Sequence, residues 1–160
     1  MVKRNLVLWT LISMLILLNV GCDQATKRIA REKLQGQPPI ELFQRTVVLA
    51  YVQNQGGFLS MFSQLSEPYR AILLVYLPLL FLAAGAVYLY ATPSGSLLRI
   101  AAGATIIGGG LSNIVDRIRA GAVVDFVSFG IGSIRTGILN TADLSVTFGC
   151  AMLILAFRRS

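Results

Sequence analysis

The chain has 160 residues, a length that fits one domain, and 55% of them are hydrophobic while only 13% are charged, about half of the roughly 25% found in soluble domains. The net charge of +7 is scattered over loops and termini with no basic stripe or recognition module, so nucleic acid is excluded as a partner. With no histidine and only two cysteines, Cys22 and Cys150, the chain cannot perform Ser-His or Cys-His hydrolysis or hold a zinc ion, and we expect both cysteines to serve packing.

Four apolar segments predict helices that cross a membrane, which takes about 20 residues. They lie at about residues 6–22, 70–91, 97–116 and 138–157. The first and last few residues are basic, which favours both termini in the cytoplasm. The two longer connections, residues 23–69 and 117–137, then lie outside, although basic residues after the first span weigh against this orientation.

The first apolar segment could also be a secretory signal peptide, because Lys3 and Arg4 precede it. It ends in Leu18-Asn19-Val20-Gly21-Cys22, close to the lipobox of a lipoprotein precursor. The lipobox takes an aliphatic residue where this chain has Asn19. Since three more spans follow, we predict that the first helix is kept.

The connections on the outer side contain two segments typical of strands, residues 45–52 and 122–129, which could pair into a small sheet. Residues 23–27 continue helically from the first span, with Asp23 and Lys27 spaced as an i,i+4 ion pair. Ala104 and Gly108 have the small-residue spacing that lets membrane helices approach closely. The predicted fold class is an all-α membrane protein in one domain, residues 1–160, with four transmembrane helices, a small extracytoplasmic β-sheet and a short interfacial helix.

Charged residues at membrane depth are costly and indicate function. Asp116 ends the third span beside Arg117, which favours an ion pair between these neighbours. Asp125 lies inside an apolar strand and Asp143 near the start of the fourth span, and neither has an adjacent base. Two carboxylates in a partly apolar site cannot both ionise, which suits aspartic peptidase chemistry. A four-span proton-coupled transporter or ion relay would use the same aspartates, and a lipid-binding protein would leave two unpaired acids unexplained.

Five motifs in a fixed order resemble the bacterial lipoprotein signal peptidase (signal peptidase II) family, and together they span about three-quarters of the chain. The motifs are Asp23-Gln-Ala-Thr-Lys27, Asn54-Gln-Gly56, Gly108-Gly-Gly-Leu-Ser-Asn113-Ile-Val-Asp116-Arg117, Val123-Val-Asp125-Phe126 and Asn140-Thr-Ala-Asp143. One departure follows the second motif, where the family usually has two alanines before phenylalanine and serine. This chain has Gly57-Phe58-Leu59-Ser60, so the aromatic residue comes one position early.

The resemblance implies an intramembrane aspartic endopeptidase without metal or other cofactor, in which Asp125 and Asp143 are catalytic. It implies a diacylglyceryl-modified prolipoprotein as substrate, cut on the N-terminal side of the lipidated cysteine. Eight further residues are implied to bind the substrate or support the site: Asp23, Lys27, Asn54, Gly56, Asn113, Asp116, Arg117 and Asn140. Asp23, Lys27 and Asn54 would form its outer wall. We further expect a monomer surrounded by lipid in the bacterial cytoplasmic (inner) membrane, with the active site near its extracytoplasmic face.

Overall fold

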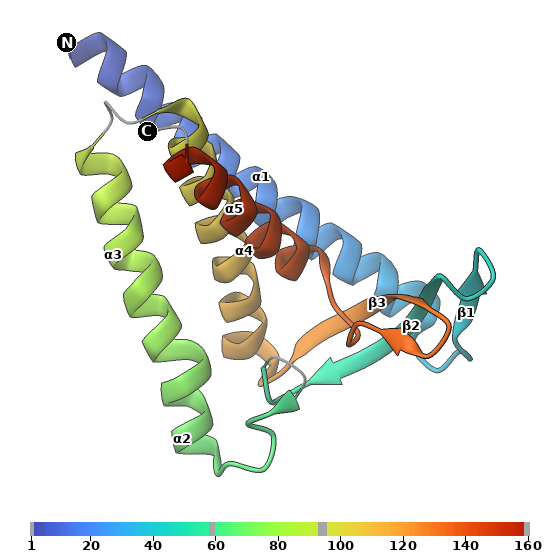
Figure 1. Cartoon of the computed structure of the whole chain (residues 1–160). Helices are drawn as coiled ribbons and strands as arrows, with labels where there is room; N and C mark the ends of the chain where they lie inside the picture. Colours follow the sequence, from blue (N-terminus) through green and yellow to red (C-terminus); the bar gives the residue numbers. More distant parts are fainter. Residues whose placement is uncertain (1, 58–59, 93–95, 159–160) are drawn as a thin grey trace.

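The computed structural model describes residues 2–57, 60–92 and 96–158. It is a bundle of long helices with a small antiparallel sheet across one end (Figure 1). Both termini lie at the other end of the bundle (Figure 1). The predicted arrangement, four apolar helices plus a sheet, is therefore confirmed.

Four helical segments are long and apolar enough to cross a membrane. The first is helix α1 (Val2–Leu34). The second joins α2 (Glu67–Ala71), a π-helical turn η2 (Ile72–Tyr76) and α3 (Leu77–Ala91) without a break. The third and fourth are α4 (Leu97–Ala120) and α5 (Thr141–Arg158). All four predicted spans are thus found.

Helix α1 does not end near residue 22 but continues to Leu34. Residues 23–34 contain no glycine or proline, so nothing in the sequence stops the helix before Gly36, whose φ is +75°. The helical continuation predicted for residues 23–27 is therefore confirmed, and it extends further than predicted, to Leu34. The lipobox-like residues 18–22 lie in the middle of an unbroken helix.

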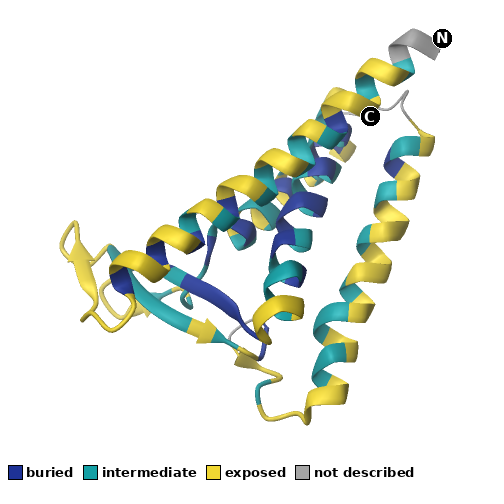
Figure 2. Cartoon of the chain, turned by 180° about the vertical axis from the view of Figure 1, so that it is seen from behind, coloured by how far each residue is buried: buried dark blue, intermediate teal, exposed yellow. Residues whose placement is uncertain are grey.

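Helix α4 is the centre of the bundle and carries many of its buried residues (Figure 2). Three consecutive glycines let the other helices approach it. A Cβ on Gly108 would lie 2.6 Å from the Cβ of Asn19 in α1, and one on Gly109 would lie 2.6 Å from the carbonyl oxygen of Ala142 in α5. A Cβ on Gly110 would lie 2.7 Å from a leucine side chain of α3. The close helix approach predicted for this segment is confirmed.

The sheet has four antiparallel strands in the order β1 (Ile40–Leu42), β2 (Val47–Asn54), β3 (Val123–Ile131) and β4 (Ile134–Arg135). The predicted pairing of the two longer strands is confirmed, with Asp125 of β3 opposite Val52 of β2. Strand β3 is buried over most of its length, and it lies between the end of α1 and the end of α4 (Figure 1).

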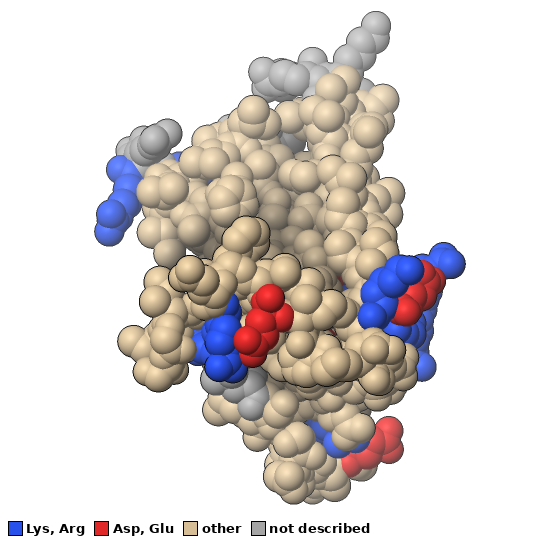
Figure 3. All heavy atoms as spheres, turned by 90° about the vertical axis from the view of Figure 1, so that its right-hand side faces the viewer, with Lys and Arg blue, Asp and Glu red and all other residues tan. Residues whose placement is uncertain are grey.

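Charged side chains are unevenly distributed over the surface. On the face shown in Figure 3 they gather at the end with the sheet, and most of the helical surface above is uncharged. An uncharged band along the helices suits contact with hydrocarbon.

Cys22 and Cys150 are free thiols on exposed positions of α1 and α5. Neither is packed inside the bundle, so their predicted role in packing is wrong.

Candidate active site

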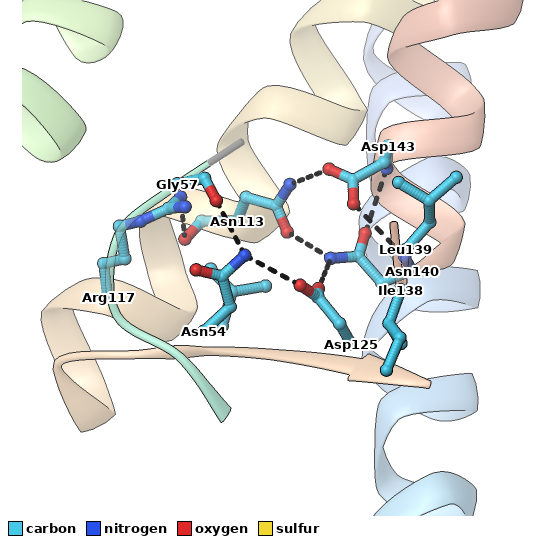
Figure 4. Close-up of a pocket in the computed structure, with 10 residues that line it drawn as sticks. Asn54, Gly57, Asn113, Arg117, Asp125, Ile138, Leu139, Asn140 and Asp143 are labelled. Carbon is cyan, nitrogen blue, oxygen red and sulfur yellow. Dashed lines mark hydrogen bonds between the residues drawn. The ribbon is translucent and has the colours of Figure 1, made fainter. Parts of the chain in front are cut away.

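A small pocket of about 80 Å³ lies where the sheet meets the helix bundle (Figure 4). This volume has room for water molecules, each of which takes about 30 Å³ in the liquid. Its walls come from β2, α4, β3, α5 and the short segments beside them. The lining residues are Asn54, Gly57, Asn113, Arg117, Val123, Asp125, Ile138, Leu139, Asn140 and Asp143.

Asp125 reaches the pocket from the middle of β3 and is only 3% exposed. Its Oδ1 accepts a hydrogen bond of 2.7 Å from the Asn140 side-chain amide, and its Oδ2 accepts one of 2.9 Å from that of Asn54. Burial raises the pKa of Asp125, because removal from water disfavours the charged form. The two amide donors act in the opposite direction on this pKa, while the nearby charge of Asp143 raises it.

Asp143 reaches the same pocket from the first turn of α5. Its backbone N–H donates to Oδ1 of Asn140 at 2.9 Å, and the Asn140 N–H donates back to the Asp143 carboxylate at 3.2 Å. This reciprocal pair has the geometry of a capping box, which fixes the start of a helix. The second carboxylate oxygen accepts a hydrogen bond of 2.9 Å from Asn113. Asn140 therefore contacts both aspartates.

Two of the asparagine amides can face the aspartates in only one orientation. The side-chain oxygen of Asn54 accepts from the backbone N–H of Gly56 at 3.0 Å, and that of Asn140 accepts from the backbone N–H of Asp143. A backbone N–H can only donate, so each asparagine must turn its oxygen toward that N–H. Each amide NH₂ is then left to face Asp125. The two oxygens of Asp125 thus meet donors by necessity.

A buried ion cluster lies directly behind the pocket. The ammonium of Lys27, in α1, lies 2.5 Å from Asp23 and 2.7 Å from Asp116, and it donates to Oδ1 of Asn113 at 2.8 Å. The predicted Asp23–Lys27 pair is confirmed. The predicted pair between Asp116 and Arg117 is wrong, because consecutive residues of a helix do not face each other.

Asp23 also connects α1 to the start of α5. Its Oδ1 accepts the backbone N–H of Ala142 at 2.7 Å, and its Oδ2 accepts the hydroxyl of Ser112 at 2.7 Å. Asp23 and Lys27 therefore lie behind the pocket rather than in its wall. Sequence reasoning missed two residues of this cluster, Ser112 and Gln24. The side-chain amide of Gln24 donates hydrogen bonds to Ser112 and to Asp116. The four-residue spacing of Ser112 and Asp116, one helical turn, was the available signal.

The turn after β2 forms another part of the wall. Gly57 has φ of +76° and its carbonyl accepts a 2.7 Å hydrogen bond from Asn54. Gly56 is buried, and a Cβ there would lie 2.5 Å from the carbonyl oxygen of Ser60. Only glycine therefore fits this tight turn. The early aromatic residue, Phe58, lies outside the described residues.

Arg117 completes the polar wall. It comes from the last turns of α4 and is partly buried, with Nη1 3.4 Å from the carbonyl oxygen of Asn113. Its Nε is buried and has no hydrogen-bond partner among the described residues. The guanidinium thus places a positive charge in the wall that also contains the two aspartates.

A larger groove of about 630 Å³ opens from the pocket and shares Asn113, Arg117 and Asp143 with it. Apolar side chains of three membrane spans line the groove. Leu74 and Pro78 come from the second span, Ile114 from α4 and Val146 from α5. An extended or lipid-bearing chain lying in this groove would pass directly beside Asp143.

Comparison with known proteins links this arrangement to one group of membrane proteases. Residues 15–159 match the family described as signal peptidase (SPase) II. The lipoprotein signal peptidase of Halothermothrix orenii is 32% identical over 145 residues, which cover 91% of this chain and 93% of that protein. The lipoprotein signal peptidase of Moorella thermoacetica is 31% identical, covering 88% of this chain and 87% of that protein.

Two solved structures share the fold. Both are described as bacterial membrane enzymes obtained by the in meso method. They match with TM-scores of 0.78 and 0.79 at 25% sequence identity. The first match covers 94% of this chain and 88% of the solved one, and the second covers 92% of each.

Proposed function

The chain belongs to the signal peptidase II family of proteases, and we propose that it is an intramembrane aspartic endopeptidase that removes the signal peptide from diacylglyceryl-modified prolipoproteins, cutting on the N-terminal side of the lipidated cysteine. One observation carries the aspartic mechanism: Asp125 and Asp143, from different elements, line one pocket and both hydrogen-bond to Asn140. The direct test is incubation of the detergent-purified protein with a lipidated prolipoprotein and mass analysis of the products.

In this mechanism Asp143 is the base. It lies at the N-terminus of α5, where the helix dipole favours a charged carboxylate, and both of its oxygens accept N–H donors. Asp125 is the acid, since it is only 3% exposed and lies in a strand, where no helix dipole favours its charged form. The opposite protonation of two neighbouring carboxylates is what peptide hydrolysis by water requires.

The proton transfers balance as follows. Asp143 takes a proton from water, whose oxygen attacks the scissile carbonyl carbon, while Asp125 gives its proton to the carbonyl oxygen. The tetrahedral intermediate collapses when Asp143 passes its proton to the leaving nitrogen. The C–N bond breaks, and the hydroxyl proton returns to Asp125. Arg117, which lines both the pocket and the apolar groove, would hold a backbone carbonyl of the substrate.

The apolar groove supports a lipidated substrate. Its wall between α3 and α5 is formed largely by uncharged side chains, and its polar end is the pocket itself. Acyl chains and the apolar part of a signal peptide gain free energy by leaving water for such a surface, about 25 cal/mol per Å² buried. The scissile bond, which is polar, would then lie at the end where Asp143 and Arg117 are found.

We expect both termini to be cytoplasmic and the sheet to be extracytoplasmic. A reporter fused after Ser160 should register as cytoplasmic, because the termini share one end of the bundle and are basic (Figure 1). A reporter inserted at Gly36, an exposed turn after α1, should register as exported. An exported C-terminal reporter or a cytoplasmic one at Gly36 would contradict this orientation.

We expect kcat/KM to fall at alkaline pH as the acid, Asp125, loses its proton. The hydrogen bond from Asn54 favours the ionised form of Asp125 and so lowers its pKa. Removing this donor with Asn54→Ala should therefore raise that pKa and move the alkaline limb of the profile to higher pH. Pre-steady-state cleavage measured across a pH series would show the shift.

The matched control for this prediction is Gln53→Ala, on the neighbouring position of β2. Gln53 is exposed and its amide donates to the Tyr51 hydroxyl rather than to either aspartate. Its pH profile should equal that of the wild type. An alkaline limb that stays in place, or moves to lower pH, in Asn54→Ala would show that Asp125 is not the acid.

A further inference from the structure

The third asparagine of the site, Asn113, differs from the other two in what fixes its amide. No backbone N–H donates to its side-chain oxygen in the described residues; that oxygen accepts from Lys27 at 2.8 Å and from the Asn140 amide at 3.2 Å. Its NH₂ group donates to Asp143 at 2.9 Å. Two side-chain donors, the nearer from Lys27 and the other from Asn140, therefore decide which end of this amide meets Asp143.

Lys27 is suited to fix this orientation because an ammonium has three donors and no acceptor. The ammonium lies within ion-pair distance of Asp23 and Asp116, and it donates a hydrogen bond to Asn113. Lys27 is only 2% exposed, so water does not compete for these contacts. The two carboxylates hold the ammonium in place, and the ammonium in turn holds the oxygen of Asn113.

Reversal of this amide would have a direct consequence for Asp143. The carbonyl oxygen of Asn113 would then face the Asp143 carboxylate at the distance of the present hydrogen bond, 2.9 Å. Two acceptors at this distance repel each other, and Asp143 would turn away or stay protonated. Either change would remove the base from its position beside the groove.

We propose that Lys27 is a positioning residue for the reaction: its ammonium fixes the amide of Asn113 so that Asn113 presents an N–H, and not its carbonyl, to Asp143. This inference rests on the proposed function of Asp143 as base. It assigns Lys27 a role beyond stabilising the bundle, since the ion cluster would hold α1 against α4 whichever way the amide of Asn113 pointed.

The simple variant Lys27→Met would leave Asp23 and Asp116 buried without a cation, and it can fail to fold for that reason alone. The test therefore changes the ion cluster as a unit, with the triple variant Asp23→Asn/Lys27→Met/Asp116→Asn compared with the wild type. The carboxylates become amides of the same shape, the ammonium is removed, and no buried charge is left unpaired. Melting curves select the variants that are folded.

The decisive experiment is a double-mutant cycle of this triple variant and Asn113→Ala, with the wild type as reference and kcat and KM measured on a lipidated prolipoprotein. Each change should lower kcat by about 10²-fold, the effect of a misplaced catalytic group, with KM unchanged. Because Lys27 acts through Asn113, the combined variant should be no slower than Asn113→Ala alone. Arg28→Met, which removes an exposed cation of the same helix, is the control and should leave kcat unchanged.

Additive losses in the cycle, or a triple variant as active as the wild type, would overturn the role of Lys27. Failure of the proposed function would look different, because Asp143→Asn would then cleave normally in the otherwise unchanged protein. A cycle with additive losses alongside an inactive Asp143→Asn would leave the aspartic mechanism intact and refute the positioning role alone.

Discussion

Asp125→Asn and Asp143→Asn are each expected to lower kcat by about 10⁴-fold or more, because an amide can neither take the proton from water nor return it. The double variant should be no slower than either single one, since members of a catalytic unit fail together. A gel-shift assay on a lipidated prolipoprotein measures these losses.

The Asp125→Asn variant should also melt at a lower temperature. Its new NH₂ group would face one of the two amide donors, from Asn54 or Asn140, that now meet the carboxylate. Melting curves should therefore accompany the assay. Glu32→Gln, an exposed acid of α1, is the control and should change neither activity nor melting. Robust cleavage by either aspartate variant would refute the catalytic assignment.

Gly109→Ala is expected to destabilise the protein by about 1–3 kcal/mol, the usual cost of overpacking, and to lower activity as well. The new Cβ would lie 2.6 Å from the carbonyl oxygen of Ala142, a backbone atom that cannot move unless α5 moves. Because Asp143, the proposed base, is the next residue, any displacement of α5 here also displaces its carboxylate. Thermal melting in detergent and the cleavage rate of the same samples check both effects.

The matched control is Gly85→Ala in α3. Gly85 is also a helical glycine of a membrane span, but a Cβ there would meet nothing within 4 Å. Alanine has the higher helix propensity, so this variant should be as stable as the wild type or more so. Equal melting temperatures for the two variants would show that the contact between Gly109 and α5 is not tight.

The elements of this fold that hydropathy and strand patterns could predict are the long ones. The four spans follow from runs of about 20 apolar residues, and β2 and β3 from their β-branched composition. Strands β1 and β4 have three and two residues, too few for any periodic pattern. The helical continuation through residues 23–27 could be predicted, but its further extension to Leu34 could not. The last turns of α1 are polar, and hydropathy marks where a membrane ends rather than where a helix ends.

The site was predictable in its residues but not in its contacts. Spacing alone left Asp125 and Asp143 open to a transporter interpretation, and only the resemblance separated the two. The partner of Asp116 could not be predicted, because adjacency along the chain suggested Arg117 whereas the fold supplies Lys27 from another helix. Long-range pairs of this kind depend on how helices pack, which a single sequence does not show.

The hydrogen bond from the Ala142 N–H to Asp23 joins residues 119 positions apart, the first helix to the last. A ribosome delivers α1 to the membrane before α5, so this contact forms only after the start of α5 has been made. A chain cut before residue 141 lacks both the contact and Asp143. On the proposed mechanism, such a chain would insert its first three spans without gaining the pair of aspartates that cleaves the substrate.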